Sequence, residues 1–315
     1  MKTIASLLIA SVAATALPAF AADAPKKLLV VSTTAGFRHS SIPTAEKVIA
    51  ELATQTGLFT VEFVQQPPGE PSAPRRPAPL RENATDEQKQ AFQEQMRKYR
   101  EAEENYRKAK ADWDQALKQA LARLSPDSLR NYDGVIFANT TGDLPIPDKE
   151  GFLDWLRSGK AFIGMHSASD TFANWPEFIE MLGGHFQWHG QQVGVECINE
   201  DPVHPSTVHL GKSWAIPQEE IYLFRNYDRS RVHNLLSLDK HPNNGTPGHY
   251  PVSWTREYGK GKVFYTSLGH REDIWDADPN LPNRRNPVEV SRAYQAHILG
   301  GIKWALGLAD SPAAM

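Results

Sequence analysis

The chain has 315 residues, of which 40% are hydrophobic and 23% charged, and its formal net charge is −3. This composition is typical of a globular protein with a large core, and the slightly acidic balance argues against binding of nucleic acid or anionic membranes. Cys197 is the only cysteine, which excludes an intramolecular disulfide, so folding must depend on the apolar core.

The first 21 residues are typical of an export signal. Lys2 supplies a positive charge, residues 4–17 form a short apolar run, and Ala19 and Ala21 are small residues at the positions read by a signal peptidase. The run is shorter than the ~20 residues needed to cross a bilayer, although an uncleaved anchor is the alternative. We therefore expect cleavage after Ala21 and a periplasmic or secreted protein, residues 22–315, with no membrane attachment after cleavage.

Strands and helices alternate in the first half of the chain. Short β-branched runs predict strands, and apolar residues at helical spacing, with Pro43 in a first turn, predict helices between them. Strands are predicted at 27–32, 60–64, 133–138 and 161–165, and helices at 42–52 and 148–157. This order predicts a doubly wound, mainly parallel sheet.

The second half changes character. Short alternating runs at 193–198, 221–224 and 232–238 predict strands joined by turns, a stronger strand is predicted at 263–267, and a helix at 290–306 closes the chain. We interpret these as antiparallel strands added to the same sheet, so that residues 22–315 form a single domain.

An insertion of different composition occupies residues 66–126. Residues 67–79 are proline-rich and should be extended, and Thr85 with Gln88 forms a capping box before a helix predicted at 86–124. Apolar residues recur along this helix at alternating spacings of four and three. The segment is expected to form a hairpin or a helix that packs on its own globule; a homo-oligomer formed through it, or an arm over the active site, is the alternative.

Histidines follow three of the predicted strands. His39 lies in the loop after the first strand, His166 directly follows the fourth, and His270 follows the strand at 263–267. In a doubly wound sheet, functional groups gather in the loops past the carboxyl ends of the strands. A lone histidine near a strand end is more often structural, but three that converge on one crevice favour a functional site.

The segment Gly164–Ala168 has the strand–turn–helix form of a nucleophile elbow, which projects its central side chain above the sheet. The central residue is His166, and imidazole suits acid–base work or metal binding better than acyl transfer. Ser167 lies one position too late to act as the nucleophile of such an elbow.

Several short motifs follow one another along residues 27–308. They are Phe37–Ile42 (FRHSSI), Tyr132–Asp133 with Asn139–Gly142 (NTTG), Gly164–Asp170 (GMHSASD), Trp175–Pro176 with Gly183–Phe186 (GGHF), His204–Pro205, Glu220 with Tyr222, Pro251–Trp254 (PVSW), and Gly259–Gly261 with Tyr265–His270 (YTSLGH). In this order they resemble the ThuA-like family, within the class I glutamine-amidotransferase-like superfamily. The chain departs from the family pattern in the insertion, at Gly190, where the family often has proline, and at Glu219, where it often has aspartate.

The resemblance implies a flavodoxin-like sheet that has lost the amidotransferase cysteine, and a role in the use of trehalose and related disaccharides. It also implies action on oxidised (3-keto) sugars. Glutamine hydrolysis is not expected, because the elbow lacks cysteine and Cys197 falls in a different predicted strand.

The expected function is that of a carbohydrate-processing enzyme acting on a small sugar substrate, a (3-keto) disaccharide or glycoside. A carbonyl at C3 acidifies the neighbouring C–H, so that a well-placed base can start elimination or isomerisation. The expected catalytic residues are His166 and His39 as base and acid, Asp170 as the group that orients His166, and Glu220 as a second carboxylate. The expected substrate-binding residues are Phe37, Arg38, Thr140, Thr141, Ser167, Trp188 and Trp254.

Three alternatives stay open at this point. His39, His166, His189 and His270 could supply imidazoles to a divalent metal such as Zn²⁺, although their spacing forms no compact metal motif. The protein could also be a non-catalytic sugar-binding module. A third reading is a scaffold built around the helix at 86–124.

Overall fold

A computed structural model describes residues 24–308 of the chain. The predicted export signal, residues 1–21, lies outside the described residues, so its cleavage remains a prediction. No helix among residues 24–308 is long and apolar enough to span a bilayer.

One mixed sheet of nine strands runs through the globule in the order β2-β1-β3-β4-β11-β10-β9-β6-β7. Its strands are β1 (Lys26–Val31), β2 (Phe59–Val64), β3 (Gly134–Ala138), β4 (Ala161–Met165), β6 (Val193–Asn199), β7 (Ser213–Glu219), β9 (His233–Lys240), β10 (Pro247–Tyr258) and β11 (Gly261–Thr266). The first five strands in this order pair in parallel, and from β11 to β7 the pairing is antiparallel. The parallel order 2-1-3-4-11 is that of a flavodoxin-like sheet, as expected, and the antiparallel strands extend it without a second domain.

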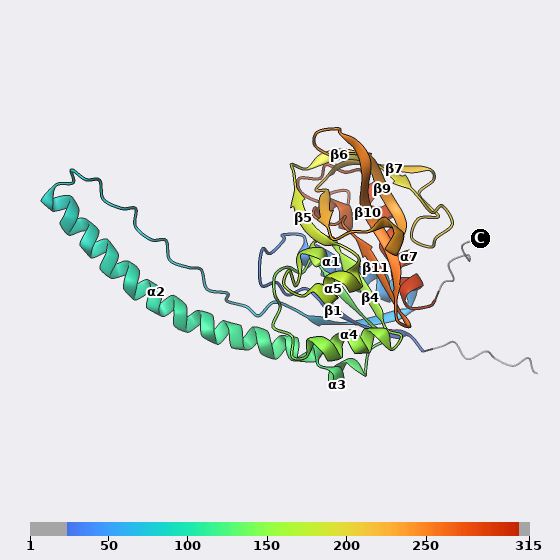
Figure 1. Ribbon diagram of the computed structural model, residues 1–315, viewed down its shortest axis with the longest axis horizontal. Helices are drawn as coiled ribbons and strands as arrows, with labels where there is room; N and C mark the ends of the chain where they lie inside the picture. The colour runs from blue at the N-terminus through green and yellow to red at the C-terminus, as the bar shows by residue number, and fades with distance from the viewer. Residues whose placement is uncertain (1–23, 309–315) are drawn as a thin grey trace, which may run out of the picture.

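Helices cover both faces of the parallel part (Figure 1). They are α1 (Ile42–Thr56), α2 (Asp86–Leu121), α3 (Pro126–Leu129), α4 (Lys149–Arg157), α5 (Pro176–Leu182), α6 (Glu272–Trp275) and α7 (Val288–Ala305), with short 3-10 helices η1 (Ala122–Leu124), η2 (His166–Asp170) and η3 (Arg229–Arg231). One core lies between the sheet and α1, α6 and α7, and the other between the sheet and α4, α5 and the end of α2. Alternation along β1 divides the strand between the cores, since Leu28 and Val30 join the first and Leu29 and Val31 the second.

The central strands are apolar because helices cover both of their faces. Every residue of β3 (GVIFA) and β4 (AFIGM) is buried. Burial of a large apolar side chain contributes ~1.5–3 kcal/mol, so these short strands hold the centre of the fold. The loops that follow their carboxyl ends are thereby fixed at one edge of the sheet.

Two strands of the antiparallel part were not predicted from the sequence. β7 (Ser213–Glu219) and β10 (Pro247–Tyr258) carry interior prolines and mixed polar residues, so their alternation is weak. A separate ribbon pairs β5 (His185–His189) with β8 (Tyr222–Arg225). This ribbon contributes Tyr222 and His189 to the candidate site described below.

The insertion forms an arm that projects away from the globule (Figure 1). The capping box of Thr85 and Gln88 is present, and α2 follows for 36 residues. Only Trp113, Leu117 and Leu121, in the last part of α2, are buried. The expectation that the whole helix packs on its own globule is therefore wrong for its first two-thirds, because the globule offers it no apolar surface there.

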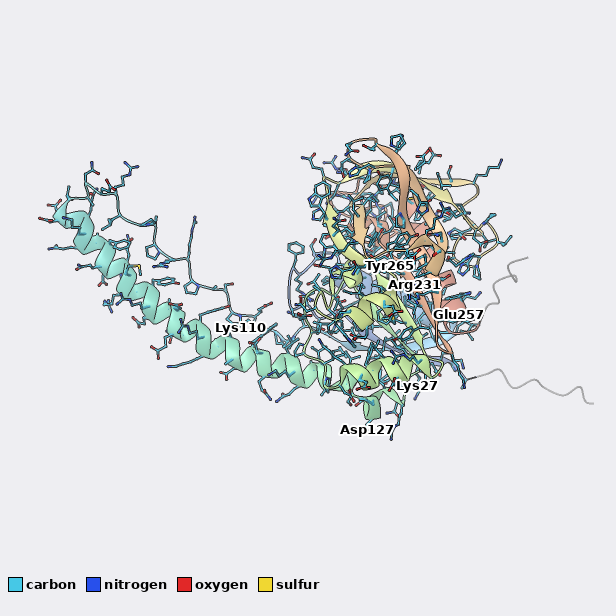
Figure 2. The ribbon with its side chains drawn as sticks, in the orientation of Figure 1. Lys27, Lys110, Asp127, Arg231, Glu257 and Tyr265 are labelled. Atoms are coloured by element: carbon cyan, nitrogen blue, oxygen red, sulfur yellow. The ribbon has the colours of Figure 1, made fainter. Side chains whose placement is uncertain are left out.

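The proline-rich segment runs from β2 to the tip of the arm in an extended conformation, and α2 returns from the tip to the globule (Figure 1). Pro71, Pro74 and Pro77 are half-buried while most of their neighbours are exposed. A period of three is that of a polyproline II helix, so one edge of the segment faces inward. On α2, Phe92 and Tyr99 are half-buried, and most other side chains of the arm extend into solvent (Figure 2).

Candidate active site

The candidate site lies beyond the carboxyl ends of β1, β3, β4 and β11, where the sheet topology brings their loops together. Asn139, after β3, has a left-handed backbone (φ 55°), which asparagine tolerates better than most residues. Its Nδ2 donates to Ser41 Oγ at 3.0 Å and to the Gly269 carbonyl at 2.9 Å. Ser41 Oγ donates to the same carbonyl at 3.1 Å, so the loops after β1, β3 and β11 are joined at one point.

His166 occupies the elbow after β4 and is completely buried. Its φ of 48° is unusual for a residue with a side chain, a conformation that costs roughly 1–3 kcal/mol unless its surroundings hold it. The Tyr265 hydroxyl donates to the His166 carbonyl at 2.7 Å and also contacts Ser169 Oγ at 2.8 Å. His166 Nδ1 lies 2.8 Å from the Ser267 carbonyl, which can only accept, so Nδ1 carries the proton and Nε2 is unprotonated.

Four side chains converge on the unprotonated nitrogen of His166. His39 Nε2 lies 3.1 Å away, His270 Nδ1 3.3 Å and the Tyr222 hydroxyl 3.1 Å. The Glu220 carboxylate lies 3.9 Å from the same nitrogen and 3.3 Å from His270 Nδ1. One donor atom from each of His39, His166, His270 and Glu220 falls within a 4.8 Å cluster, so these four could hold a metal ion.

The cluster keeps two of its imidazoles neutral. Burial, reinforced by His270, lowers the pKa of His39 to about 4. Burial and the neighbouring His39 lower the pKa of His166 well below its usual value. Burial also acts to lower the pKa of His270, but its hydrogen bond to Glu220 and the charge of that carboxylate outweigh burial and raise it. At neutral pH the cluster therefore offers unprotonated nitrogens beside one carboxylate.

Glu220 joins the cluster to an accessible histidine. Its Oε1 lies 3.1 Å from His189 Nδ1, while its Oε2 faces His270 and His166. His189 Nδ1 also lies 2.9 Å from the Gly190 carbonyl, so this nitrogen is the donor and Nε2 is free. The His189 side chain is 44% exposed, whereas that of Glu220 is 7% exposed.

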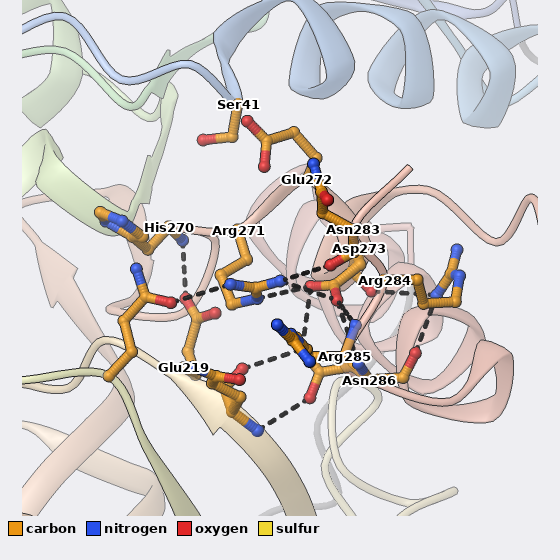
Figure 3. Close-up of polar contacts among 12 residues, drawn as sticks. Ser41, Glu219, His270, Arg271, Glu272, Asp273, Asn283, Arg284, Arg285 and Asn286 are labelled. Atoms are coloured by element: carbon orange, nitrogen blue, oxygen red, sulfur yellow. Dashed lines mark hydrogen bonds and ion pairs between the residues drawn. The ribbon is translucent and has the colours of Figure 1, made fainter. Parts of the chain in front are cut away.

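A polar network holds the loop that carries His270 (Figure 3). Glu219 Oε1 accepts from the backbone N–H groups of Gly269 and His270, at 3.0 and 2.6 Å, and burial raises the pKa of Glu219 to about 7. Nearby, the buried Asp273 carboxylate accepts from the Arg271 guanidinium and from Asn286. These bonds fix the backbone on both sides of His270.

Exposed aromatic rings lie near the cluster. Phe37 is 68% exposed, and its ring meets that of His39 edge-on, with 4.8 Å between centroids. Trp188 is 51% exposed and neighbours His189 in β5. A sugar ring could stack on either, but only Phe37 touches a member of the cluster.

Several of the residues predicted for this site have other contacts. Trp254 is fully buried and donates to the Leu182 carbonyl, so it cannot stack on a substrate in this structure. Thr140 and Thr141 are buried, and their hydroxyls bond to Thr171 and to the Phe37 carbonyl. They shape the loops without presenting free hydroxyls.

Three further predictions concern the surroundings of the imidazoles. Ser167 Oγ lies 3.2 Å from His39 Nδ1, so it positions that ring. Asp170 was expected to orient His166, but the Ser267 carbonyl occupies Nδ1, and this expectation is wrong. Arg38 donates to the Ser32 carbonyl and is largely exposed.

In the sequence, Tyr222 stands out only with Glu220 in a family-like motif, with no role in the site, and nothing there identifies the Ser267 carbonyl or the Asp273 network. Tyr222 stands two residues after Glu220, and that spacing in a short apolar strand is the one signal that could have indicated a shared site. A main-chain carbonyl leaves no residue-type signal at all.

Comparisons with known proteins agree with this architecture. The model of the ThuA family, described as trehalose utilisation, matches residues 80–305, which is well over half of the chain. A ThuA-like protein of Bacteroides uniformis shares 18% identity with a TM-score of 0.55, covering 92% of this chain and 95% of its own. A ThuA-like protein of Parabacteroides merdae gives 18% identity, a TM-score of 0.57 and coverage of 92% and 93%. At this identity the two structures show a shared fold. No curated protein matches the sequence.

Proposed function

The chain belongs to the ThuA family, and from this premise we propose that it is a carbohydrate-processing enzyme that acts on 3-keto disaccharides or glycosides. The family's description, trehalose utilisation, supports the carbohydrate role. The reaction centre in this proposal is the cluster of His39, His166, His270 and Glu220, with the more exposed side chains of Phe37 and His189 beside it.

The proposed reaction needs two groups on the protein. One must stabilise negative charge on the C3 carbonyl oxygen, and the other must accept the proton from C2. When the C2–H bond breaks, its electrons form an enolate whose negative charge lies on the C3 oxygen. The C3 carbonyl then re-forms, the C1–C2 double bond forms, the C1–O glycosidic bond breaks, and the departing oxygen takes up the proton that the base removed. Charge stabilisation and a positioned base together supply most of the acceleration in such reactions, the base typically ~10²–10⁴-fold.

His189 is the base in this proposal. Glu220 fixes the tautomer of His189 by accepting from Nδ1, which leaves Nε2 as the proton acceptor on an exposed ring. A carboxylate that orients an imidazole is a common arrangement for a general base. His166, the base expected from the sequence, is completely buried. Its unprotonated nitrogen faces other side chains of the cluster, so His166 is not the base in this proposal.

In this proposal the C3 carbonyl oxygen of the substrate binds at the buried cluster. The buried Tyr222 hydroxyl lies among the converging nitrogens and can donate to a developing oxyanion there. The convergence of three imidazoles, Glu220 and Tyr222 on one point, beneath the accessible His189, is the observation that carries the proposal.

Glutamine hydrolysis has no support in this fold. The elbow presents His166 in place of a thiol, and Cys197 is fully buried in β6. Burial raises the pKa of Cys197 to about 12, so its thiolate is not available as a nucleophile.

The test uses the purified protein and its His189→Ala variant, with His241→Ala as the control. His241 lies on the surface loop after β9, and its contacts run to Trp188 and Tyr250. Conversion of 3-keto-trehalose and of trehalose is followed by NMR in protein loaded with divalent metals. We expect conversion of the keto-sugar only, a fall of ~10²–10⁴-fold in His189→Ala, and no change in His241→Ala. Binding of the sugars without conversion by any of the proteins would overturn the proposal in favour of a binding module.

A further inference from the structure

We infer that His39, His166, His270 and Glu220 form a binding site for one divalent first-row transition metal ion, such as Zn²⁺. The site deepens the proposed function by supplying the charge that binds the carbonyl oxygen, but its evidence is independent of any substrate. That evidence lies in the proton positions, the separations of the donor atoms and the groups that surround them.

Proton positions show that the cluster cannot be satisfied by its own hydrogen bonds. His166 Nε2 has a single lone pair, because Nδ1 holds the proton that faces Ser267. His39 Nε2, His270 Nδ1 and the Tyr222 hydroxyl all lie within 3.3 Å of this one lone pair. Only one of the three can donate into it, so the other contacts bring polar atoms together without a hydrogen bond. A cation at the point of convergence would satisfy the imidazole nitrogens together.

The separations of the donor atoms fit metal coordination. Bonds of ~2.0–2.1 Å in a tetrahedral arrangement set neighbouring ligand atoms about 3.3–3.4 Å apart. The observed separations are 3.1 Å for His39–His166, 3.3 Å for His270–His166, 3.3 Å for His270–Glu220 and 3.9 Å for His166–Glu220. Imidazole and carboxylate ligands together favour a transition metal over Ca²⁺ or Mg²⁺, which prefer oxygen ligands.

Three of the four ligands have outer partners that orient them for metal binding. His166 Nδ1 faces the Ser267 carbonyl, His39 Nδ1 faces Ser167 Oγ, and Glu220 Oε1 faces His189 Nδ1. Such partners fix the tautomer and the ring orientation of ligands in metal sites. They also explain why His189, predicted from the sequence as a ligand, is not one. Its Nδ1 is committed to the far oxygen of Glu220, on the other side of the carboxylate from the cluster.

The elements that supply the ligands make the site rigid before any metal binds. The ligands come from the loops after β1, β4 and β11 and from the turn between β7 and β8, and Asn139 and Glu219 join the loops. A preformed site loses little conformational entropy on binding, which favours high affinity.

The experiment measures metal content directly in untagged protein. Protein stripped with chelator is reloaded with ZnCl₂ or CoCl₂, passed through gel filtration, and analysed by mass spectrometry of the metal and by the visible spectrum of the Co²⁺ form. We expect one equivalent in the wild type and in His241→Ala, and at least ~10-fold weaker binding in Glu220→Gln and in His270→Ala. Circular dichroism at each step shows whether a variant is folded. The His270 side chain is 21% exposed, and Glu220→Gln keeps the size of the side chain, so these two variants test the site even if His166→Ala does not fold.

Less than a tenth of an equivalent in the reloaded wild type would overturn the inference, as would equal binding by the wild type and both ligand variants. Sugar conversion is then measured with and without metal. Bound metal without conversion would refute the proposed reaction and leave the metal site standing, whereas full conversion by the stripped protein would refute a role for the metal in the reaction.

Discussion

The globule and the arm are built on opposite principles. In the globule, strands such as β3 and β4 are only five residues long and every residue is buried, so their positions depend on neighbours distant in the sequence. In the arm, α2 has 36 residues but only three buried ones, all close to the globule. Its distal part depends on the capping box and on weak ion pairs between residues three or four apart, such as Glu94–Arg97 and Glu103–Arg107. Local chemistry can thus specify a long helix, whereas a site assembled from four loops needs a packed core beneath it.

A matched pair of truncations should show the largest difference between the two regions. Phe152 is fully buried in α4 and packs against Phe137, whereas Phe92 is half-buried on the distal arm. We expect Phe152→Ala to lower the free energy of unfolding by ~3–5 kcal/mol, and Phe92→Ala by less than about 0.5 kcal/mol. Urea denaturation followed by tryptophan fluorescence measures both. Similar losses in the two variants would mean that the arm is part of the cooperative fold.

The response to acid should sharpen the same comparison. Burial lowers the pKa of His297, on α7, to about 3, below the ~6.5 of an unfolded histidine. The unfolded state therefore binds a proton first as the pH falls, so stability that is fully present above pH 6.5 is lost between about 6.5 and 3. The arm, residues 66–126, contains no histidine, so no histidine in it contributes to this loss of stability at low pH.

The measurement compares the wild type with His297→Asn, whose side-chain amide can replace Nδ1 as the donor to the Ser206 carbonyl. Relative to this variant, the wild type should lose up to ~1.4 kcal/mol per pH unit in that window. Chemical denaturation at a series of pH values tests this. Parallel stability curves for the two proteins would show that His297 takes up its proton in the folded state.

Removal of the arm should have the smallest effect. Trp113 Nε1 donates to the Pro67 carbonyl at 3.1 Å, so the two ends of the arm lie close together at its base. Replacing residues 71–109 with a short Gly/Ser linker should change sugar conversion by no more than about two-fold, because exposed segments tolerate replacement. Light scattering on both proteins would test the homo-oligomer predicted for this helix. A change from an oligomer to a monomer in the shortened protein would confirm the prediction. Lost conversion with the same number of subunits would place the arm in the reaction.

Much of the fold could be predicted because its signals are local. The runs at 134–138 and 161–165 contain no polar side chain, and the capping box at Thr85 marks the start of α2 to the residue. β7 and β10 could not be predicted, because their pairing compensates for weak alternation and interior prolines. The loops that meet at the site followed from the topology, since parallel strands end at one edge of their sheet.

The contacts within the site were harder to predict than its place. The sequence placed His39, His166 and His270 in one crevice, and the structure brings them within hydrogen-bonding distance. Trp254 was a candidate for substrate binding with a core position as the alternative, and the structure buries its side chain completely. A residue type shows what a side chain can do, and only the packing around it decides which way it points.

By itself, the sequence determined the order of the parallel strands and their helices, the family and the loops that carry the histidines, because composition and periodicity act over a few residues. The tertiary structure alone decided that Glu220, and not His189, lies beside the imidazoles and that the Ser267 carbonyl sets the tautomer of His166. Those outcomes depend on separations of a few ångströms between atoms more than 30 residues apart in the chain, and such separations are fixed by the packed core.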